Sequence, residues 1–193
     1  MVDAASNDVV NNSARLVTIF GGSGFVGRHV VRALAKRGWR IRVATRRPDL
    51  AFHLQPIGRP GQIQMVQANV RFPDSVAHAL RGSDAVINLV GVLAESGRQS
   101  FDAVHEFGAR AVAKAAKEAG VGALIQMSAL SANSDSPSAY AASKGVSSWN
   151  FIDRAWNFSM YGTTDSSQTF HAEHLASKTH GTHATSIAVR TDT

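Results

Sequence analysis

The sequence predicts an α/β domain with a doubly wound parallel sheet, and three observations support this fold class. The apolar run Leu16–Phe20 is typical of a buried strand, and it leads directly into a glycine-rich turn and then a helical pattern. Further strand-like runs alternate with helical segments as far as Lys144. One of them, Asp84–Gly91 (DAVINLVG), is short and apolar, as a strand buried on both faces should be. This alternation predicts parallel strands, right-handed crossovers and helices on both faces of the sheet.

The glycine-rich turn satisfies two spacings, Gly22-x-Gly24-x-x-Gly27 and Gly21-x-x-Gly24-x-x-Gly27. Glycines between a strand and a helix allow a tight turn, close approach of the backbone to a pyrophosphate, and close helix–strand packing. The N-terminus of the following helix offers free N–H groups and a positive dipole end to phosphates. The turn therefore predicts a dinucleotide-binding site, and a plain strand-to-helix turn is the alternative.

The remaining elements follow from apolar periodicity and from glycine and proline positions. The predicted strands are Trp39–Thr45, Ile63–Gln67, Asp84–Gly91 and Gly122–Met127, and the predicted helices are Asp74–Arg81 and Phe101–Ala119. Asp49–Gly61 is predicted to be a connection, with a short helix at its start as an alternative. In the helix predicted at Phe101–Ala119, Val104 and Phe107 are expected to face inward. The strands and helices together form one domain over residues 16–144.

Composition limits the functional classes. The net charge of +6 could indicate nucleic acid, but much of the basic charge lies between Arg28 and Arg47, which favours a phosphate-binding cleft or a docking face. The chain has no cysteine, which excludes disulfides and fits a reducing compartment. No apolar run reaches membrane-spanning length, and the polar residues 1–15 are expected to be a disordered lead-in rather than a signal peptide.

The end of the second predicted strand indicates the preferred cofactor. In a dinucleotide fold this position meets the adenosine ribose, where a carboxylate accepts the 2′-hydroxyl of NAD and an arginine accommodates the 2′-phosphate of NADP. Here the position is held by Thr45, Arg46 and Arg47. We therefore expect NADP(H) in preference to NAD(H), with a phosphate contact from at least one arginine; two solvated arginines are the alternative.

A second pair of residues has catalytic spacing. Tyr140 and Lys144 form a Tyr-x-x-x-Lys pair, and residues four apart on a helix share a face. An ammonium group beside a phenol stabilises the phenolate, so the pair can act as an acid or base near neutral pH. Ser128, at the end of the fifth predicted strand, could orient a substrate carbonyl or could simply cap the turn.

The C-terminal segment contains two His-x-x-His pairs, His171 with His174 and His180 with His183. Such pairs can bind a metal when they share a helical face. Serine, threonine and glycine surround them, and Glu173 is the one nearby carboxylate, so we expect solvated histidines and no metal site.

These motifs together resemble the extended and atypical short-chain dehydrogenase/reductase superfamily, through GGSGFVG, Arg46-Arg47 and YAASK. HLQPIGRPGQ, VINLVG, KEAGV and LIQMSALSAN are most similar to the NAD(P)H-binding accessory subunit of respiratory complex I and its bacterial relatives. The resemblance extends over Leu16–Lys144. It implies a tightly held NADPH and a place on the complex at the membrane periphery, in the cytoplasm or on the inner face of the respiratory membrane, without established turnover.

The resemblance also implies roles for individual residues. The pyrophosphate would lie against the glycine-rich turn, the 2′-phosphate against Arg46, the adenine against Asn69 and Val70, and the nicotinamide ribose against Tyr140 and Lys144. The implied turn residues are Gly21, Ser23, Gly24, Phe25, Val26 and Gly27, and those of the ribose region are Leu89, Val90 and Gly91. An active NADP-dependent reductase, or a sugar-nucleotide epimerase or dehydratase, is the alternative to a structural or assembly role.

The chain departs from this pattern after Lys144. The segment 145–193 has no Arg-Pro strand, no sustained period, and many serine, threonine and histidine residues. A shifted reading frame or a foreign end would produce such a change, which predicts a poorly ordered tail and a sheet that ends at the fifth strand. The alternative is a divergent lobe, with a helix at Ser147–Met160 and a late strand at Ala184–Arg190.

Overall fold

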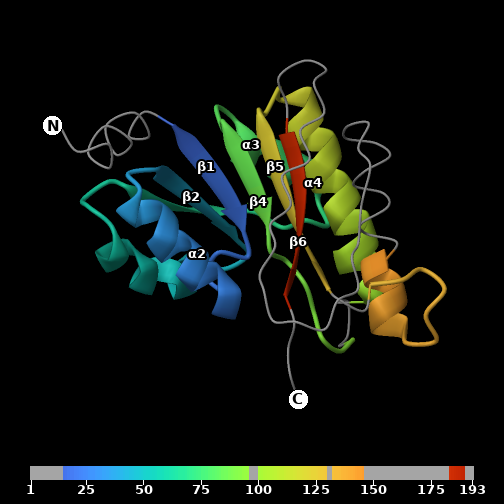
Figure 1. Cartoon of the computed structure of the whole chain (residues 1–193). Coiled ribbons are helices and arrows are strands. Elements are labelled where there is room, and N and C mark those ends of the chain that lie inside the picture. The colour runs from blue at the N-terminus through green and yellow to red at the C-terminus, as the bar shows by residue number, and fades with distance from the viewer. Residues whose placement is uncertain (1–14, 96–99, 130–131, 146–182, 190–193) are drawn as a thin grey trace, which may run out of the picture.

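The computed structural model describes residues 15–95, 100–129 and 132–145, together with the backbone of residues 183–189. Six strands form one sheet in the order β3-β2-β1-β4-β5-β6 (Figure 1). Every neighbouring pair is parallel. The strand order reverses between β1 and β4, and in sheets of this kind ligands bind outside the carboxyl ends of the strands at that point.

Strands and helices alternate along the chain, as the sequence predicts. The strands are β1 (Leu16–Phe20), β2 (Arg40–Thr45), β3 (Ile63–Gln67), β4 (Ala85–Asn88), β5 (Ala123–Ala129) and β6 (His183–Val189). The helices are α2 (Phe25–Lys36), the 3-10 helix η1 (Pro48–Ile57), α3 (Pro73–Leu80), the π-helix η2 (Asp102–Glu106) and α4 (Phe107–Glu118). The chain is also helical at residues 139–145.

Two hydrophobic clusters lie on opposite faces of the sheet. On one face, α2 and η1 pack on β1, β2 and β3 through residues such as Val31, Leu54 and Ile41. On the other, α3 and α4 pack together against the sheet through residues such as Leu80 and Val112. All five residues of β1 are buried because helices cover both faces of the sheet. The doubly wound parallel fold is therefore confirmed.

The helix predicted at Phe101–Ala119 is present, but its first part winds differently. Residues Asp102–Glu106 form a π-helix, which has more residues per turn than an α-helix and therefore rotates the side chains that precede α4. His105 is buried in consequence, whereas Phe107, predicted to face inward, is 44% exposed. The prediction for Phe107 is wrong because a uniform period of 3.6 does not hold through this segment.

The sheet continues beyond β5, where the sequence predicts it to end. β6 pairs in parallel with β5 over seven positions, from Ala123 opposite His183 to Ala129 opposite Val189. The outer edge of β5 is therefore paired, contrary to the expected open edge. The strand nearly coincides with Ala184–Arg190, the late strand of the divergent-lobe alternative. The helix of that alternative and the lead-in at residues 1–14 lie outside the described residues, so the division of the chain at Lys144 stays a prediction.

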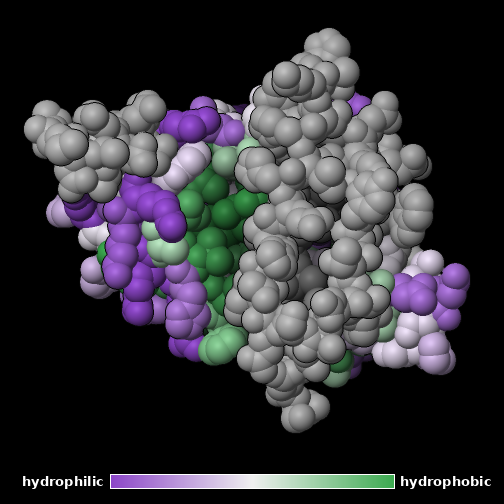
Figure 2. All heavy atoms as spheres, viewed as in Figure 1, coloured by the Kyte–Doolittle hydropathy of each residue, from purple (hydrophilic) through white to green (hydrophobic). Residues whose placement is uncertain are grey.

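Hydrophobic residues gather on the face of the sheet beside α2. Figure 2 shows them as a green area next to the hydrophilic surface of the helix. Leu89 and Ile125 are among the partly buried hydrophobic residues that pack on this side of the core. Leu89 directly follows β4 and Ile125 lies on β5, so the apolar face extends beyond the strands that α2 and η1 cover.

The pairing of β6 with β5 predicts a specific pattern of hydrogen exchange. In a parallel strand, alternate amides point to opposite neighbours, so about half of the β5 amides depend on β6. Ending the chain at Thr182 should speed exchange of those amides and leave the amides that face β4 unchanged. Removing residues 190–193 alone is the control and should change neither set. If all β5 amides keep their exchange rates in the shorter chain, β6 does not pair with β5.

Candidate functional site

The glycine-rich turn lies directly against the ends of β2 and β4, the two strands that flank β1. Gly21 has a φ of +77°, which glycine adopts without the steric penalty of other residues. Its N–H donates to the carbonyl of Ala44 over 3.4 Å, and a Cβ on Gly21 would lie 3.1 Å from the carbonyl carbon of Leu89. A Cβ on Gly27 would lie 2.6 Å from the Cα of Gly22. A side chain at Gly21 would push the turn away from the end of β4, and one at Gly27 would push α2 away from the turn.

The N-terminus of α2 completes this part of the site. The helix begins at Phe25, directly after the N-cap residue Gly24, whose N–H donates to the carbonyl of Gly21 over 3.0 Å. The first N–H groups of a helix have no partner within it, and the helix dipole makes this end positive. Ser23 and Val26 are half-buried here, and Phe25 is exposed beneath the guanidinium of Arg28. The turn and helix together form a cradle of backbone donors that suits a phosphate.

The two arginines after β2 have different surroundings. Arg47 forms an ion pair with Asp49, with 3.1 Å between Nη2 and Oδ2, and a second hydrogen bond from Nε. Hydrogen bonding to Asp49 raises the pKa of Arg47 and lowers the pKa of Asp49. Arg46 lines two adjoining pockets instead. The structure thus separates a pocket-lining arginine from one that is already paired.

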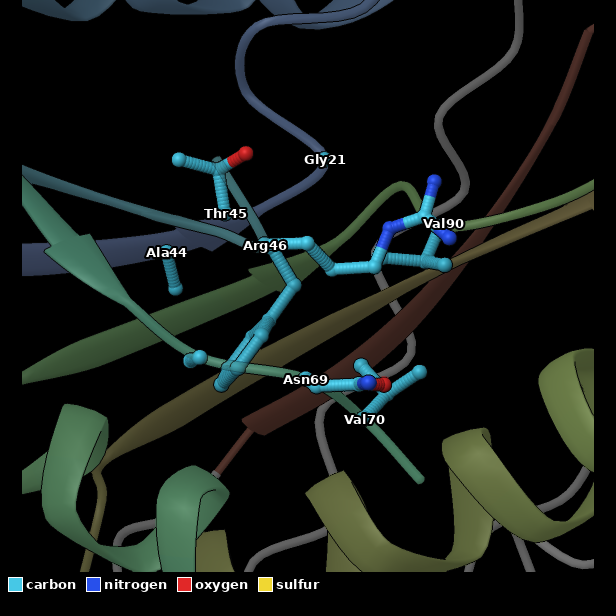
Figure 3. Close-up of a pocket in the computed structure, with 9 residues that line it drawn as sticks. Gly21, Ala44, Thr45, Arg46, Asn69, Val70 and Val90 are labelled. Atoms are coloured by element: carbon cyan, nitrogen blue, oxygen red, sulfur yellow. The ribbon is translucent and has the colours of Figure 1, made fainter. Parts of the chain in front are cut away.

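The first pocket lies at the carboxyl ends of β1, β2, β3 and β4. In the close-up, the side chain of Arg46 extends across it in the direction of Val90 (Figure 3). The pocket is lined by Phe20, Gly21, Ala44, Thr45, Arg46, Ala68, Asn69, Val70 and Val90. One cation over a largely apolar floor is an arrangement that suits a flat heterocycle joined to an anionic group.

Asn69 and Val70 form one wall of this pocket, directly after β3. The Oδ1 of Asn69 accepts from the backbone N–H of Arg71 over 3.1 Å, and its backbone N–H donates to Ser75 Oγ over 3.0 Å. Val70 is buried, and a Cβ on Gly108 of α4 would lie 2.9 Å from its Cγ2. Both residues are therefore held in place by neighbouring elements.

The chain that leaves β4 contributes Val90 to this pocket and Gly91 to the second one, whereas Leu89 lines neither. The N–H of Leu89 donates to the carbonyl of Phe20 over 2.9 Å, and that of Val90 donates to Asn88 Oδ1 over 3.2 Å. Asn88 is itself buried and donates to Gln126 Oε1 over 2.8 Å. Because these buried amides satisfy one another, they fix the path of the strand end at the pocket.

Tyr140 and Lys144 lie in the helical segment at residues 139–145. This segment lies close to Gly91, in the chain that leaves β4. A Cβ on Gly91 would lie 3.1 Å from Lys144 Nζ and 3.3 Å from His105 Nε2, so the backbone of Gly91 lies close to both side chains. Tyr140 contacts His105 edge-on, with 5.8 Å between ring centroids, and Phe101 at 6.0 Å. The predicted Tyr-Lys pair is thus beside the pocket-lining strand end.

Burial changes the acidity of two of these groups. Lys144 is 3% exposed, and loss of solvation lowers its pKa to about 8. Loss of solvation, with a smaller contribution from the charge of Lys144, lowers the pKa of His105 to about 4. At neutral pH the histidine is therefore neutral, and the lysine can release its proton more readily than an ordinary lysine.

Ser128 lies at the penultimate position of β5 and is half-buried. The ring contacts of Tyr140 are with Phe101 and His105, which come from the segment before α4 rather than from β5. A role for Ser128 in orienting a carbonyl therefore stays a prediction.

Sequence reasoning did not single out several residues of this site. Arg71, Val92 and Val104 line the second pocket together with Arg46, Asn69, Val70, Val90 and Gly91. His105 joins the β4 end to the 139–145 segment. A histidine among the alanine and valine residues of an inward helical face was the signal available for His105, but the π-helical turn that buries it leaves no pattern in the sequence.

The described residues contain no cluster of three or more His, Asp or Glu side chains that could hold a metal ion. Of the four histidines in the C-terminal pairs, only His183 falls within a described element. Within the same residues, every helix is too short or too polar to cross a membrane.

Comparison with known proteins agrees with this geometry. A sequence model of the family described as NAD(P)H-binding matches residues 21–154. The chain is 38% identical over 129 residues to a ceramide reductase from Caulobacter vibrioides, covering 67% of this chain and 39% of the reductase. It is 37% identical over 136 residues to the mouse mitochondrial NADH dehydrogenase [ubiquinone] 1 alpha subcomplex subunit 9, covering 69% of this chain and 36% of the subunit. The chain thus spans less than two fifths of the length of each relative.

Solved structures share the fold. The X-ray structure of Pen from Bacillus thuringiensis superposes with a TM-score of 0.59 at 22% identity, covering 71% of this chain and 44% of that chain. At this identity the likeness shows a common fold and nothing about a substrate.

The buried Lys144 predicts how stability depends on pH. Its pKa is about 8 in the folded chain and 10.5 ordinarily, so between these values the unfolded chain binds more protons. The free energy of unfolding should therefore rise with pH across this window, by about 3 kcal/mol from this group. Urea titrations at pH 7.5, 9 and 10.5 measure the rise, and Lys144→Met should abolish it. Lys114→Met, at an exposed position of α4, should keep it; a rise that survives in Lys144→Met would contradict the assignment.

Proposed function

The chain belongs to the NAD(P)H-binding family, and on that basis we propose that it holds NADPH in a structural or assembly role of the complex I accessory-subunit type. A nicotinamide dinucleotide is the cofactor of this family, and the preference for the phosphorylated form is our proposal. The observation that carries it is the pocket in which Gly21, Arg46 and Asn69 come together at the carboxyl ends of the strands.

The residues of the site fit the parts of such a cofactor. The first N–H groups of α2, at Phe25 and Val26, lie beside Ser23 and suit the pyrophosphate. The largely apolar pocket beside Val70 suits the adenine, and Val90 and Gly91, which line the pockets after β4, suit the ribose region. The segment carrying Tyr140 and Lys144 is adjacent to Gly91 and suits the nicotinamide ribose.

The preference for NADPH rests on Arg46. A guanidinium that lines the pocket can form charge-assisted hydrogen bonds with a 2′-phosphate, whereas NADH would leave it facing a hydroxyl. Asp49, the carboxylate nearest in sequence, is paired with Arg47. Arg47 therefore supports the loop while Arg46 supplies the contact to the cofactor.

The structural role rests on the relatives that carry the name of a respiratory enzyme subunit. Mouse subunit 9 and several further relatives are named as subunits of NADH dehydrogenase or NADH-ubiquinone oxidoreductase. We propose that this chain likewise associates with subunits of respiratory complex I at the membrane periphery. Because the chain spans about 36% of the mouse subunit, the proposal concerns the nucleotide-binding part alone.

An active NADP-dependent reductase is the second candidate. The observation that favours it is the proximity of Tyr140, Lys144 and the β4 end, together with a relative named as a ceramide reductase. NADPH would supply a hydride, and Tyr140 would hold the proton that a carbonyl oxygen of the substrate takes up. The ammonium of Lys144 would stabilise the tyrosinate left behind.

Arg46→Ala should weaken NADPH binding about tenfold or more and leave NADH binding nearly unchanged, because a charge-assisted contact to the 2′-phosphate contributes ~1.5–3 kcal/mol. Isothermal titration calorimetry with both nucleotides measures this. Arg47→Ala is the matched control, one residue away, and should change NADPH affinity by less than about threefold, since its partner is Asp49. Equal or tighter binding of NADH by the wild-type chain would refute the proposed preference.

Turnover should be negligible although the nucleotide binds. Positioning of a substrate is a large part of any rate enhancement. Beside Tyr140, the side chain of His105 bonds to Ser143, and the Ser143 hydroxyl bonds to the backbone carbonyl of Tyr140. These two side chains are therefore occupied within the protein and do not position a substrate. NADPH oxidation should therefore stay at background with aldehydes, ketones and nucleotide sugars. Robust oxidation that is abolished by Tyr140→Phe would instead establish the reductase.

A further inference from the structure

His105 is the least exposed ionisable group in the described part of the site, at 1% exposure, and both of its ring nitrogens have partners. The backbone N–H of Val92 donates to Nε2 over 2.9 Å. Nδ1 lies 2.9 Å from Ser143 Oγ, and that hydroxyl donates to the carbonyl of Tyr140 over 2.7 Å. The imidazole therefore connects the chain after β4 to the helical segment at residues 139–145.

These partners fix the tautomer. A backbone amide can only donate, so Nε2 must carry a lone pair and Nδ1 must carry the proton. Ser143 Oγ then accepts a hydrogen bond from Nδ1–H, and its own hydroxyl donates a hydrogen bond to the carbonyl of Tyr140. These three hydrogen bonds run in the same direction, from Val92 through His105 and Ser143 to Tyr140, and the first of them requires a neutral ring.

Aromatic contacts hold the ring from two sides. Phe101 stacks on it with 5.4 Å between centroids and an interplanar angle of 22°, and Tyr140 meets it edge-on at 5.8 Å. On the side of Nε2, the backbone of Gly91 lies close to both the imidazole and Lys144 Nζ. Any movement of the ring would therefore displace the strand end, the tyrosine, or both.

We propose that His105 is a positioning residue of the nucleotide site. It holds the Gly91–Val92 segment, here called the turn after β4, against the segment carrying Tyr140 and Lys144. This inference rests on the proposed function, because Gly91 and Lys144 belong to the nucleotide site only if a nucleotide binds there. Without the link to Val92, the turn could move away from the helical segment, and the two halves of the site would no longer have a fixed separation.

The electrostatic surroundings keep the ring neutral. Burial and the ammonium of Lys144 lower the pKa of His105 to about 4, so the neutral form persists well below physiological pH. Among the described residues, the titratable groups that face the imidazole are Lys144 and Tyr140, both from the 139–145 segment. Protonation would place a second N–H opposite the N–H of Val92, and the link would be lost.

Two substitutions separate the two hydrogen bonds of His105. The amide of glutamine reaches the position of Nε2, so His105→Gln keeps an acceptor for Val92 and loses the link to Ser143. The amide of asparagine reaches only the position of Nδ1, so His105→Asn keeps Ser143 and loses Val92. His78→Asn, at an exposed position of α3, is the matched control.

The full chain and its variants are compared by NADPH calorimetry at pH 7.5, by hydrogen exchange of the Val92 amide, and by nitrogen-15 NMR of the histidine rings. We expect His105→Asn to bind NADPH about tenfold more weakly and to exchange the Val92 amide faster. We expect His105→Gln and His78→Asn to stay within about twofold of the wild type on both measures. The wild-type His105 should remain in the Nδ1–H form from pH 8 down to pH 5.5, and its NADPH affinity should fall only below about pH 5.

Several results would overturn the proposal. The first is a protonated Nε2 at pH 7.5, and the second is unchanged NADPH affinity and Val92 exchange in His105→Asn. The third is an equal loss of NADPH affinity in His105→Asn and His105→Gln that follows the loss of thermal stability in each. If the wild-type chain binds no nucleotide, the proposed function fails. The exchange and NMR measurements on the free chain then still decide whether His105 holds the turn.

Discussion

The site depends on the close approach of one piece of backbone to the ends of two strands. At Gly21 the chain passes between Ala44, near the end of β2, and Leu89, directly after β4, with a φ of +77° and a position for Cβ only 3.1 Å from the Leu89 carbonyl carbon. This approach closes the crevice at which the strand order reverses. Because α2 starts only four residues later, its N-terminus is aimed at the same crevice. The remaining contacts of the site are arranged around this fixed point.

Buried polar groups fix the positions of the chain segments along the carboxyl edge of the sheet. The buried amides of Asn88 and Gln126 join β4 to β5 and orient the N–H of Val90. His105 then joins the next two residues of the chain to the helical segment beyond β5. A buried polar network of this kind specifies one geometry, because displacing any member leaves a desolvated donor or acceptor without a partner. The crevice is thus held by hydrogen bonds as well as by apolar packing.

The sequence predicts the parts of this structure that are governed by local patterns. Leu16–Phe20 and Ile63–Gln67 form strands with the predicted bounds, since short apolar runs between turn residues have few alternatives. The burial of His105 and the exposure of Phe107 depend on a π-helical turn, which tertiary packing selects and no sequence period reveals. The different surroundings of Arg46 and Arg47 depend on an ion pair two residues away, and the sequence could place both arginines only at the strand end.

The strand order imposes a sequence of events during synthesis. β1 leaves the ribosome first, yet it lies at the centre of the sheet and pairs on one side with β4, whose residues follow about 70 positions later. Until β4 emerges, one edge of an entirely buried strand is open to water and to other chains. Contacts of such long separation form slowly compared with helices. A nascent chain that ends before Ala85 therefore leaves this edge of β1 without its partner strand, and the glycine-rich turn meets its second contact only when Leu89 has been added.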